Sequence, residues 1–411
     1  MFQKPRGTRD FLPDEMEARR AVEEIMRLAA GRWGYREVST PTFEELELFT
    51  VRSGEGIIQE MYAFEDKGGR MMALRPEVTA PVIRMYINEA RMLPKPLRWC
   101  YFADCFRYER PQKGRYRQFW QFGVELIGAD TALADAEVIM CAHDILAATG
   151  VDFTLHVGHL SFMKQLLSHL EPMIQKRIMM YLDKKDFEGL SVFLEEENQP
   201  DLMDSLTMLV GCHDLDEIFD LTGEIAERRW IEETCAILDA GEVNYAVSPG
   251  IARGLDYYTG MVFEGFAANL GAENQILGGG AYRLASLFGG DDVPSCGFAI
   301  GFDRVMVSLG ELSPVNEAVT AVVFTGEGRS RALEVAKRFR DEEIRTEIEI
   351  MGRSLGAQLS HAAKTARFAV IIGKRECESR RVILKDLNKG NQEDLSLEEA
   401  VQKVKASVTC R

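Results

Sequence analysis

The stretch 97–127, LRWCYFADCFRYERPQKGRYRQFWQFGVELI, decides how the N-terminal part of this chain folds. Residues 97–108 are rich in aromatic and apolar side chains, and residues 118–127 have the same character. Between them, residues 109–117 are polar and include the turn formers Pro111 and Gly114. Two strand-like runs around a polar turn predict a long antiparallel hairpin with a basic loop at its tip.

Side chains in a strand alternate between two faces, so the hairpin predicts which residues lie together. Arg107 and Glu109 share one face, and Gln121, Gly123 and Glu125 share a face of the return strand. The basic loop residues are Arg110, Lys113, Arg115 and Arg117. One interpretation is a site in which the space at Gly123 holds a cation while the arginines hold a polyphosphate. The alternative is an ordinary hairpin with a solvated charged loop.

Two further segments combine polar groups with backbone constraints. In Leu74-Arg75-Pro76-Glu77-Val78-Thr79, an extended backbone would direct Glu77 and Thr79 to one side, where they could bind an ammonium group. The alternative is a helix start with Glu77 in the first turn. The run 253–260, RGLDYYTG, places an arginine between small residues and follows it with two tyrosines. It suits either close approach of a ligand or a turn with packed aromatic rings.

The last group is glycine-rich. Residues 277–282, LGGGAY, are followed by 295–304, SCGFAIGFDR. The glycine run does not match the Walker pattern, which excludes a P-loop enzyme. Arg304 is expected just inside a helix after a glycine-rich strand, where it could contact a nucleotide or form a structural salt bridge.

The rest of the chain divides by pattern. We expect a helix at 14–33 with Asp14 as its cap, a strand at 35–39, mainly helices over 161–240, and a return to strands over 243–310. Residues 310–316 resemble a linker. Beyond it, strands and helices alternate: strand 320–325, helix 329–342, strand 345–350, helix 355–365, strand 368–373, strand 381–385 and helix 396–406. This predicts one domain at 1–318 with a helical insertion at about 161–242, and a compact α/β domain at 319–411.

Composition sets the class of protein and its surroundings. Hydrophobic residues are 46% and charged residues 28% of 411, which is typical of a globular protein. No apolar run approaches the roughly 20 residues that span a bilayer, and the N-terminus has no apolar leader core. We therefore expect a cytoplasmic protein with no membrane partner. The eight cysteines form no CxxC pair, so we expect reduced thiols and no metal site, Cys212-His213 included.

The net charge of −16 is unevenly distributed. Residues 319–411 hold 18 Lys+Arg and 14 Asp+Glu, a balance of +4, whereas residues 165–240 hold 6 Lys+Arg and 18 Asp+Glu, a balance of −12. A polyanion is therefore expected to use local basic loops and the C-terminal domain, and to avoid the middle.

Taken in order, these groups resemble the histidyl-tRNA synthetases, which are class II aminoacyl-tRNA synthetases. The segment 106–119 resembles the family's motif 2, Gly297 to Arg304 resembles motif 3, and the helix and strand up to Pro41 resemble motif 1. The run from Arg253 to Glu264 resembles the histidine-specific signature. The resemblance covers nearly the whole chain, except that the acidic middle carries no matching motif.

The resemblance implies an α+β fold: an antiparallel catalytic sheet with a helical insertion, plus a C-terminal α/β anticodon-binding domain. It implies that Arg107 and Arg253 act on the α-phosphate, with Arg107 also holding the histidine carboxylate. The implied histidine-binding residues are Glu77, Thr79, Gln121, Glu125, Tyr257, Tyr258 and Tyr282. The implied ATP-binding residues are Arg107, Glu109, Arg115, Phe119 and Arg304.

The implied reaction is activation of L-histidine by ATP with Mg²⁺, followed by transfer of histidine to tRNA(His). A homodimer formed through motif 1 is also implied, and the insertion is expected to approach the acceptor arm through residues such as Lys184 and Lys185. Three positions depart from the family pattern. Ala281 and Arg283 replace an arginine and an aspartate, and Trp120 replaces a histidine that should point away from Gln121.

Three rival interpretations are considered. The first is the non-catalytic, synthetase-like regulatory subunit of ATP phosphoribosyltransferase, which typically lacks the C-terminal domain and has a degraded histidine signature. The second is a class II synthetase for proline or threonine, and the third is an inactive tRNA-binding module. The intact signature at 253–258 disfavours the first two, and intact Arg107, Arg253 and Arg304 disfavour the third.

Overall fold

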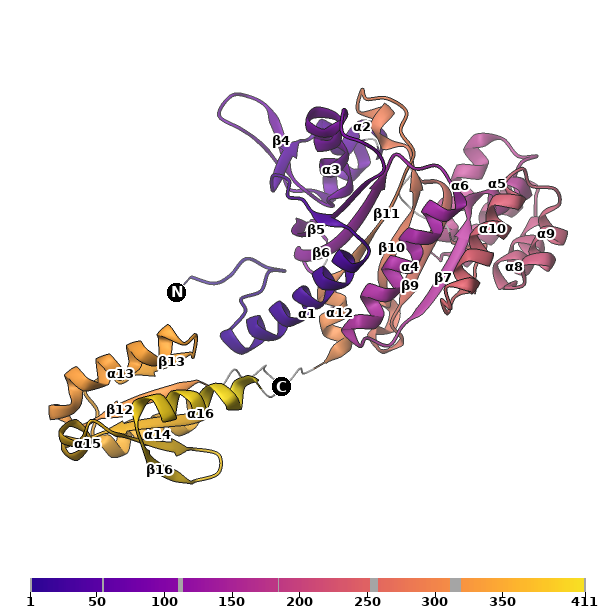
Figure 1. The fold of residues 1–411 in the computed structure, drawn as a ribbon. Helices are drawn as coiled ribbons and strands as arrows, with labels where there is room; N and C mark the ends of the chain where they lie inside the picture. The colour runs from indigo at the N-terminus through magenta and orange to yellow at the C-terminus, as the bar shows by residue number, and fades with distance from the viewer. Residues whose placement is uncertain are drawn as a thin grey trace. The chain divides into compact units, whose positions relative to one another are not determined.

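The structure is a computed structural model that describes residues 2–53, 55–109, 114–183, 185–251, 258–310 and 319–409. The chain divides into two compact units, Met1–Ser313 and Pro314–Arg411 (Figure 1). Residues 311–318 lie outside the described residues, and they include all of the predicted linker (310–316) except Gly310.

The first unit is built on an eight-stranded sheet with the order β1-β5-β6-β11-β10-β9-β7-β8 among the described strands. The predicted hairpin is confirmed: β5 and β6 pair antiparallel with Tyr101 opposite Gly123. The neighbours from β5 to β7 are all antiparallel, whereas the short edge strands β1 and β8 run parallel to their partners. The strands are β1 (Arg36–Glu37), β5 (Leu97–Phe106), β6 (Gln118–Ile127), β7 (Thr154–His159), β8 (Ala246–Val247), β9 (Tyr258–Phe266), β10 (Gln275–Tyr282) and β11 (Ser295–Gly301).

The two faces of this sheet are covered differently. Helices α1 (Pro13–Arg32) and α4 (Ala132–Thr149) pack on one face, where Phe122 and Val124 of β6 enter the main core. The opposite face carries Tyr101, Tyr258 and Tyr282 in a second, smaller core. The predicted N-terminal helix is confirmed, but Asp14 is not its cap. Leu12 occupies the cap position, because Pro13 begins the helix and leaves Asp14 in the first turn.

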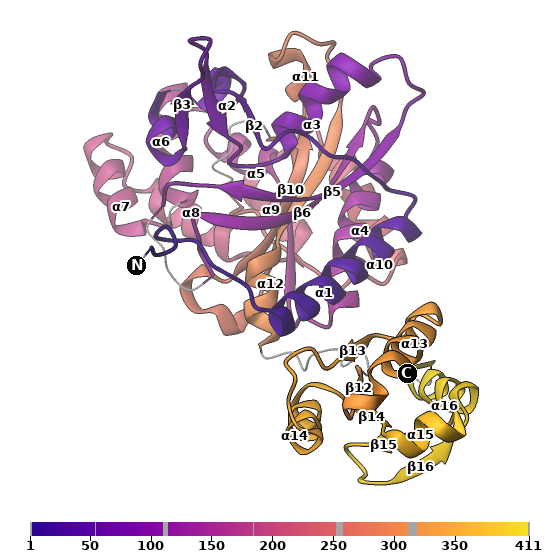
Figure 2. The same ribbon diagram turned by 90° about the vertical axis from the view of Figure 1, so that its left-hand side faces the viewer.

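A three-stranded sheet, β2-β4-β3, lies near short helices at the end of the large sheet where α3 and α11 are found (Figure 2). Its segment leads directly into the second predicted motif, since β4 ends at Leu74 and α3 begins at Thr79. The elements are β2 (Phe43–Glu45), α2 (Glu47–Ser53), η1 (Glu55–Glu60), β3 (Ala63–Glu65), β4 (Met71–Leu74), α3 (Thr79–Met85), η2 (Tyr86–Ala90) and α11 (Leu284–Leu287).

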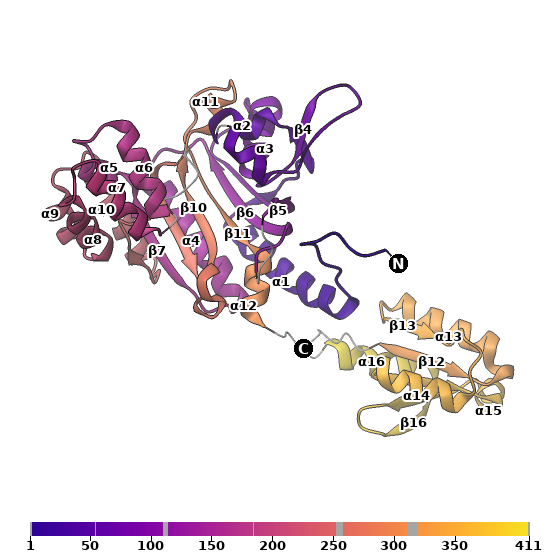
Figure 3. The same cartoon turned by 180° about the vertical axis from the view of Figure 1, so that it is seen from behind.

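The insertion between β7 and β8 is helical, as predicted, and lies beyond the β7 edge of the sheet (Figures 1 and 3). Its helices are α5 (Leu160–Leu166), α6 (Pro172–Asp183), α7 (Phe187–Glu196), α8 (Leu202–Gly211), α9 (Leu215–Thr222) and α10 (Arg228–Ala240). Helix α10 also packs against α4, so the insertion is anchored to the helical layer of the sheet. The unit closes with η3 (Ala268–Glu273) and α12 (Phe302–Leu309).

The second unit has a five-stranded sheet of order β13-β12-β14-β15-β16. The predicted strands and helices are present, within one to three residues of their bounds. Two short polar elements, α15 and β16, were not predicted. The elements are β12 (Thr320–Phe324), η4 (Gly326–Gly328), α13 (Arg329–Asp341), β13 (Thr346–Ile348), α14 (Leu355–Thr365), β14 (Phe368–Ile372), α15 (Lys374–Ser379), β15 (Val382–Asp386), β16 (Gln392–Leu395) and α16 (Leu397–Thr409).

The predicted α+β class is therefore confirmed. None of the helices in the described ranges combines the length and apolar character needed to cross a membrane.

Candidate active site

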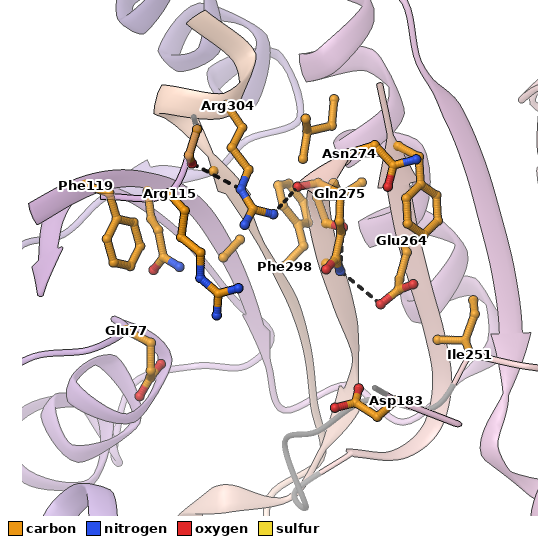
Figure 4. Close-up of a pocket in the computed structure, with 18 of the residues that line it drawn as sticks. Glu77, Arg115, Phe119, Asp183, Ile251, Glu264, Asn274, Gln275, Phe298 and Arg304 are labelled. Atoms are coloured by element: carbon orange, nitrogen blue, oxygen red, sulfur yellow. Dashed lines mark hydrogen bonds between the residues drawn. The ribbon is translucent and has the colours of Figure 1, made fainter. Parts of the chain in front are cut away.

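A cavity of about 1080 Å³ lies on the face of the large sheet that carries Tyr258 and Tyr282. It is lined by the hairpin β5–β6, by β9, β10 and β11, by the start of α12, and by residues of the insertion. Ten predicted site residues line it: Glu77, Thr79, Arg107, Glu109, Arg115, Phe119, Gln121, Tyr258, Tyr282 and Arg304. Figure 4 shows side chains from separate elements directed toward one space. Arg253 and Tyr257 lie outside the described residues.

One side of the cavity is a carboxyl cluster, made of Glu77, Thr79, Tyr101, Glu125 and Tyr282. Glu125 is completely buried and lies behind the lining residues. Its Oε1 accepts a hydrogen bond from the Thr79 hydroxyl at 2.7 Å, and its Oε2 accepts one from the Tyr282 hydroxyl. Glu125 thus fixes two hydroxyl groups that do face the cavity.

Burial controls the protonation of this cluster. It raises the pKa of Glu125 to about 8, even though hydrogen bonds from Tyr282 and Thr79 favour the ionised form. Burial also raises the pKa of Glu77, opposed by the backbone N–H groups of Ala80 and Thr79 and by the charge of Arg107. Glu125 therefore keeps its proton at neutral pH.

The space predicted at Gly123 is occupied by the protein itself. A Cβ atom at this position would lie 2.2 Å from both Cζ and the hydroxyl oxygen of Tyr101, which is the residue opposite on β5. The prediction that a cation binds there is wrong, because the Tyr101 ring fills the space. Gly297 leaves room for the Glu125 side chain in the same way, since a Cβ atom at Gly297 would lie 1.9 Å from Oε2 of Glu125. These glycines allow buried polar side chains to approach the sheet.

The segment around Glu77 forms a helix start and not the extended arrangement. The Glu77 carboxylate accepts a hydrogen bond from the backbone N–H of Ala80 at 3.1 Å, at the beginning of α3. Glu77 and Thr79 nevertheless both reach the cavity. Gln121 also lines it, and its Oε1 accepts a hydrogen bond from the Cys105 thiol at 3.3 Å.

The other side of the cavity is an arginine cluster, made of Arg107, Glu109, Arg115 and Arg304. Glu109 and Arg115 form an ion pair across the base of the loop. Burial would raise the pKa of Glu109, but the hydrogen bond from Arg115 and the charges of Arg107, Arg115 and Arg304 together lower it. Three guanidinium groups therefore converge on one carboxylate.

Arg107 connects the two clusters. Its Nε donates to the Pro76 carbonyl oxygen at 3.0 Å, next to Glu77, and its guanidinium lies 5.2 Å from the centre of the Phe119 ring. This places one arginine between the carboxyl cluster and an aromatic surface suitable for a nucleobase.

Arg304 is held by backbone oxygens. Its Nε donates to Gly114 at 3.3 Å and its Nη1 to Gln275 at 2.6 Å, and the amide of Gln275 donates to Glu264 at 2.9 Å (Figure 4). Both Gln275 and Glu264 line the cavity but were assigned no role from the sequence. Counting by two from Tyr258 along β9 would have placed Glu264 on the same face.

Of the departures from the family pattern, those at 281 and 283 lie outside the described lining of the cavity, whereas Trp120 is part of that lining. Arg283 pairs with Asp130 at 2.6 Å and with Asp292 at 3.0 Å, and neither Ala281 nor Arg283 is among the described lining residues. The Trp120 ring packs against Phe11, on the side opposite to Gln121, as predicted.

Metal ligands do not gather in the described part of the chain. No group of three or more His, Cys, Asp or Glu side chains suited to an ion is found there. His213, next to Cys212, has its Nδ1 2.7 Å from the carbonyl oxygen of Val247.

Comparisons with known proteins identify the family of the chain. A family model described as histidyl-tRNA synthetase matches residues 7–305, and one described as anticodon binding domain matches residues 313–407. The chain is 68% identical to the histidine–tRNA ligase of Methanoregula boonei over 99% of each chain, and 66% identical to that of Methanoculleus marisnigri over the full length of both. A solved apo histidyl-tRNA synthetase of S. aureus has a TM-score of 0.74 at 26% identity, covering 98% of this chain and 100% of the other.

The regulatory-subunit alternative is not favoured, because these full-length relatives are ligases and the anticodon-binding domain is present. The chain belongs to the histidyl-tRNA synthetase family, the aminoacyl-tRNA synthetases that act as histidine–tRNA ligases.

Proposed function

We propose that the cavity binds histidine at the carboxyl cluster and ATP at the arginine cluster, and joins them as histidyl-adenylate. One observation carries this proposal: a single cavity contains both clusters, with Arg107 between them. Its volume of about 1080 Å³ is slightly above the roughly 300–1,000 Å³ range of small-molecule sites, so two ligands fit side by side.

Histidine binds through its two polar ends. Glu77, Thr79 and Gln121 hold the α-amino group, since a partly buried carboxylate with neighbouring hydroxyl and amide oxygens suits an ammonium ion. Tyr258 and Glu125 bracket the imidazole, with Tyr257 and Tyr282 beside it. Because Glu125 is buried behind the lining residues, it acts through the Tyr282 hydroxyl that it holds. A neutral imidazole offers one donor and one acceptor, which a carboxyl and a phenol can satisfy together.

ATP binds through its base and its phosphates. Phe119 stacks on the adenine and Glu109 contacts its edge, while Arg115 and Arg304 hold the outer phosphates. In the ligand-free chain Arg115 is paired with Glu109, so ATP must replace that ion pair with phosphate contacts.

Adenylation is an in-line attack of the histidine carboxylate on the α-phosphorus, with pyrophosphate as the leaving group. This step needs positioning and charge neutralisation, and no nucleophilic side chain. Arg107 and Arg253 neutralise the α-phosphate, and Arg107 also orients the carboxylate. Mg²⁺ would enter with ATP as part of the substrate, where phosphate oxygens and water would hold it. Glu264 lines the same cavity and accepts a hydrogen bond from Gln275, whose carbonyl oxygen accepts one from Arg304.

Transfer to tRNA(His) uses the remaining parts of the chain. The C-terminal unit, with its balance of +4, contacts the anticodon arm. Of the two lysines expected to approach the acceptor arm, Lys185 lines the cavity, and Lys184 lies outside the described residues. We further propose a homodimer formed through the motif 1 segment, and a cytoplasmic location.

The test is histidine-dependent exchange of pyrophosphate into ATP. We expect exchange with histidine and none with proline or threonine, because those amino acids leave the carboxyl cluster without a partner. Exchange with proline or threonine alone would refute the specificity. Arg253→Ala should slow adenylation while leaving the thermal unfolding midpoint unchanged, and an unchanged rate would remove Arg253 from the mechanism.

A further inference from the structure

Residues 5–12, which precede α1, form an N-terminal segment that follows the return limb of the hairpin loop. The backbone N–H of Arg117 donates to the Gly7 carbonyl oxygen at 2.9 Å. The Arg9 guanidinium lies 3.6 Å from the centre of the Tyr116 ring, and the Phe11 ring meets Trp120 edge-on at 5.5 Å. The segment is therefore in contact with the limb at three successive points.

A buried carboxylate ties this segment to the rest of the site. Asp303, in the first turn of α12, is 2% exposed. Its Oδ1 accepts hydrogen bonds from Arg9 and from Arg19 of α1, the latter at 2.8 Å, and its Oδ2 accepts one from the backbone N–H of Trp120 at 2.7 Å. One side chain thus joins three parts of the chain that are far apart in sequence: the N-terminal residues up to α1, strand β6 and helix α12.

Two of these parts, β6 and α12, lie next to groups of the ATP site. Trp120 follows Phe119, and Asp303 precedes Arg304. Tyr116, on which Arg9 stacks, itself lines the cavity. Phe119, the proposed adenine surface, is in β6, whereas Arg304, the proposed phosphate ligand, is in α12. The distance between them therefore depends on the contacts that join β6 to α12. A displacement of about 1 Å in such a site can lower a rate a hundredfold.

We propose that Arg9 and Asp303 are positioning residues for ATP, which set the separation between the Tyr116–Phe119 limb and Arg304 without touching the reacting atoms. The proposal rests on the proposed function, since it presumes that ATP binds at the arginine cluster. Two guanidinium groups on one buried carboxylate, with Arg19 also stacked 4.2 Å from Phe11, keep the joint ordered before ATP arrives.

The experiment measures KM for ATP and KM for histidine separately in pyrophosphate exchange. Arg9→Ala should raise KM for ATP about tenfold and leave KM for histidine within about twofold, because the carboxyl cluster does not contact the segment. Added methylguanidinium should restore part of the ATP affinity by filling the place between Tyr116 and Asp303. Arg9→Lys should be intermediate, since it keeps the charge and loses the planar stack.

Arg283→Ala is the matched control, because Arg283 also bridges two aspartates but lies outside the cavity. It should leave both KM values unchanged and show no response to methylguanidinium. An equal rise in both KM values for Arg9→Ala, or no rise, would overturn the proposal. Absence of exchange in the unmodified protein would instead refute the proposed function. Asp303→Asn is a second variant that tests the same contact. If Asp303→Asn does not fold, Arg9→Ala alone still tests the proposal.

Discussion

At the carboxyl cluster, Glu125 is completely buried and already accepts hydrogen bonds from Thr79 and Tyr282, whereas at the arginine cluster Glu109 pairs with Arg115, whose side chain is 39% exposed. The first arrangement is built before the ligand arrives, and a wrong amino acid leaves buried groups unpaired. In the arginine cluster, by contrast, Glu109 is the partner of Arg115, and the phosphates of ATP must replace Glu109. The contrast indicates that selectivity for the amino acid comes from preorganised burial, and that nucleotide binding comes from exchange of ion pairs.

The largest effect is expected at Arg107, where the two clusters meet. Arg107→Ala should lower kcat/KM for exchange roughly a thousandfold, as loss of one preorganised charge at a reacting phosphate typically does. It should affect KM for both substrates, because the charge of Arg107 acts on both Glu77 and Glu109. Steady-state exchange kinetics measure both values.

The control for Arg107→Ala is Arg98→Ala. Arg98 is on the same strand pair but binds Glu137, on the side of α4. Its loss should leave exchange unchanged. If Arg107→Ala changed KM for only one substrate, the two clusters would be independent, and the place given to Arg107 would be wrong.

A smaller effect, visible as a pH profile, is expected at Glu125. With the pKa of Glu125 at about 8 and that of free histidine imidazole at about 6.5, the free carboxyl is protonated and the free imidazole neutral between these values. The complex contains the same single proton, so histidine binding in this pH range neither takes up nor releases a proton. Above about pH 8 the site must regain a proton, and below about 6.5 histidine must lose one. Hence kcat/KM for histidine should be flat between the two limits and fall on both sides.

Glu125→Gln should remove the alkaline limb of this profile and lower the plateau about tenfold, because the ionisable acceptor behind the Tyr282 hydroxyl is lost. Glu137→Gln, which changes a carboxylate on the opposite side of the sheet, should reproduce the original profile. An alkaline limb that survives in Glu125→Gln would show that another group holds the proton.

The sequence predicted those parts of the site that depend on local order. Alternation along β6 correctly grouped Gln121 with Glu125 and separated them from Trp120, because a strand repeats every two residues. It could not reveal that Tyr101 fills the space at Gly123, which depends on the register between β5 and β6. The joint at Asp303 was not predicted either, since Arg9 is 294 residues away in sequence.

The same limit applies to the fold. Long apolar runs such as 97–106 predicted their strands well, because hydrophobic periodicity is a strong local signal. The elements α15 and β16 are short and largely polar, so their formation depends on the neighbouring strands of the sheet, which local pattern does not report. Glu264 was missed for a simpler reason: its face follows from Tyr258, but nothing nearby in sequence indicates its partner Gln275.

The last prediction concerns a buried carboxyl group of α4, where we expect almost no effect on activity but a change in stability. Asp135 of α4 accepts a hydrogen bond from the indole N–H of Trp230 on α10 at 2.8 Å, and burial raises its pKa to about 6. A raised carboxyl pKa favours folding while the group is protonated, and that contribution disappears as pH rises from about 4 through about 6. A shift of two units corresponds to about 3 kcal/mol. Asp135→Asn should therefore be more stable than the original chain at pH 7.5 but not at pH 4.

Urea unfolding of the two proteins at both pH values tests this expectation, with exchange kinetics unchanged. Asp144→Asn is a close control, because Asp144 also accepts from an indole, that of Trp33 at 3.0 Å, but its side chain is 53% exposed. Exposure leaves little desolvation to relieve, so this variant should show no pH-dependent gain. If both variants gained equally, burial would not be the cause. If Asp135→Asn instead lost stability at pH 7.5, the ionised Asp135 carboxylate would be a net stabilising group. Desolvation would then not explain the raised pKa of Asp135, nor by analogy those of the carboxyl cluster.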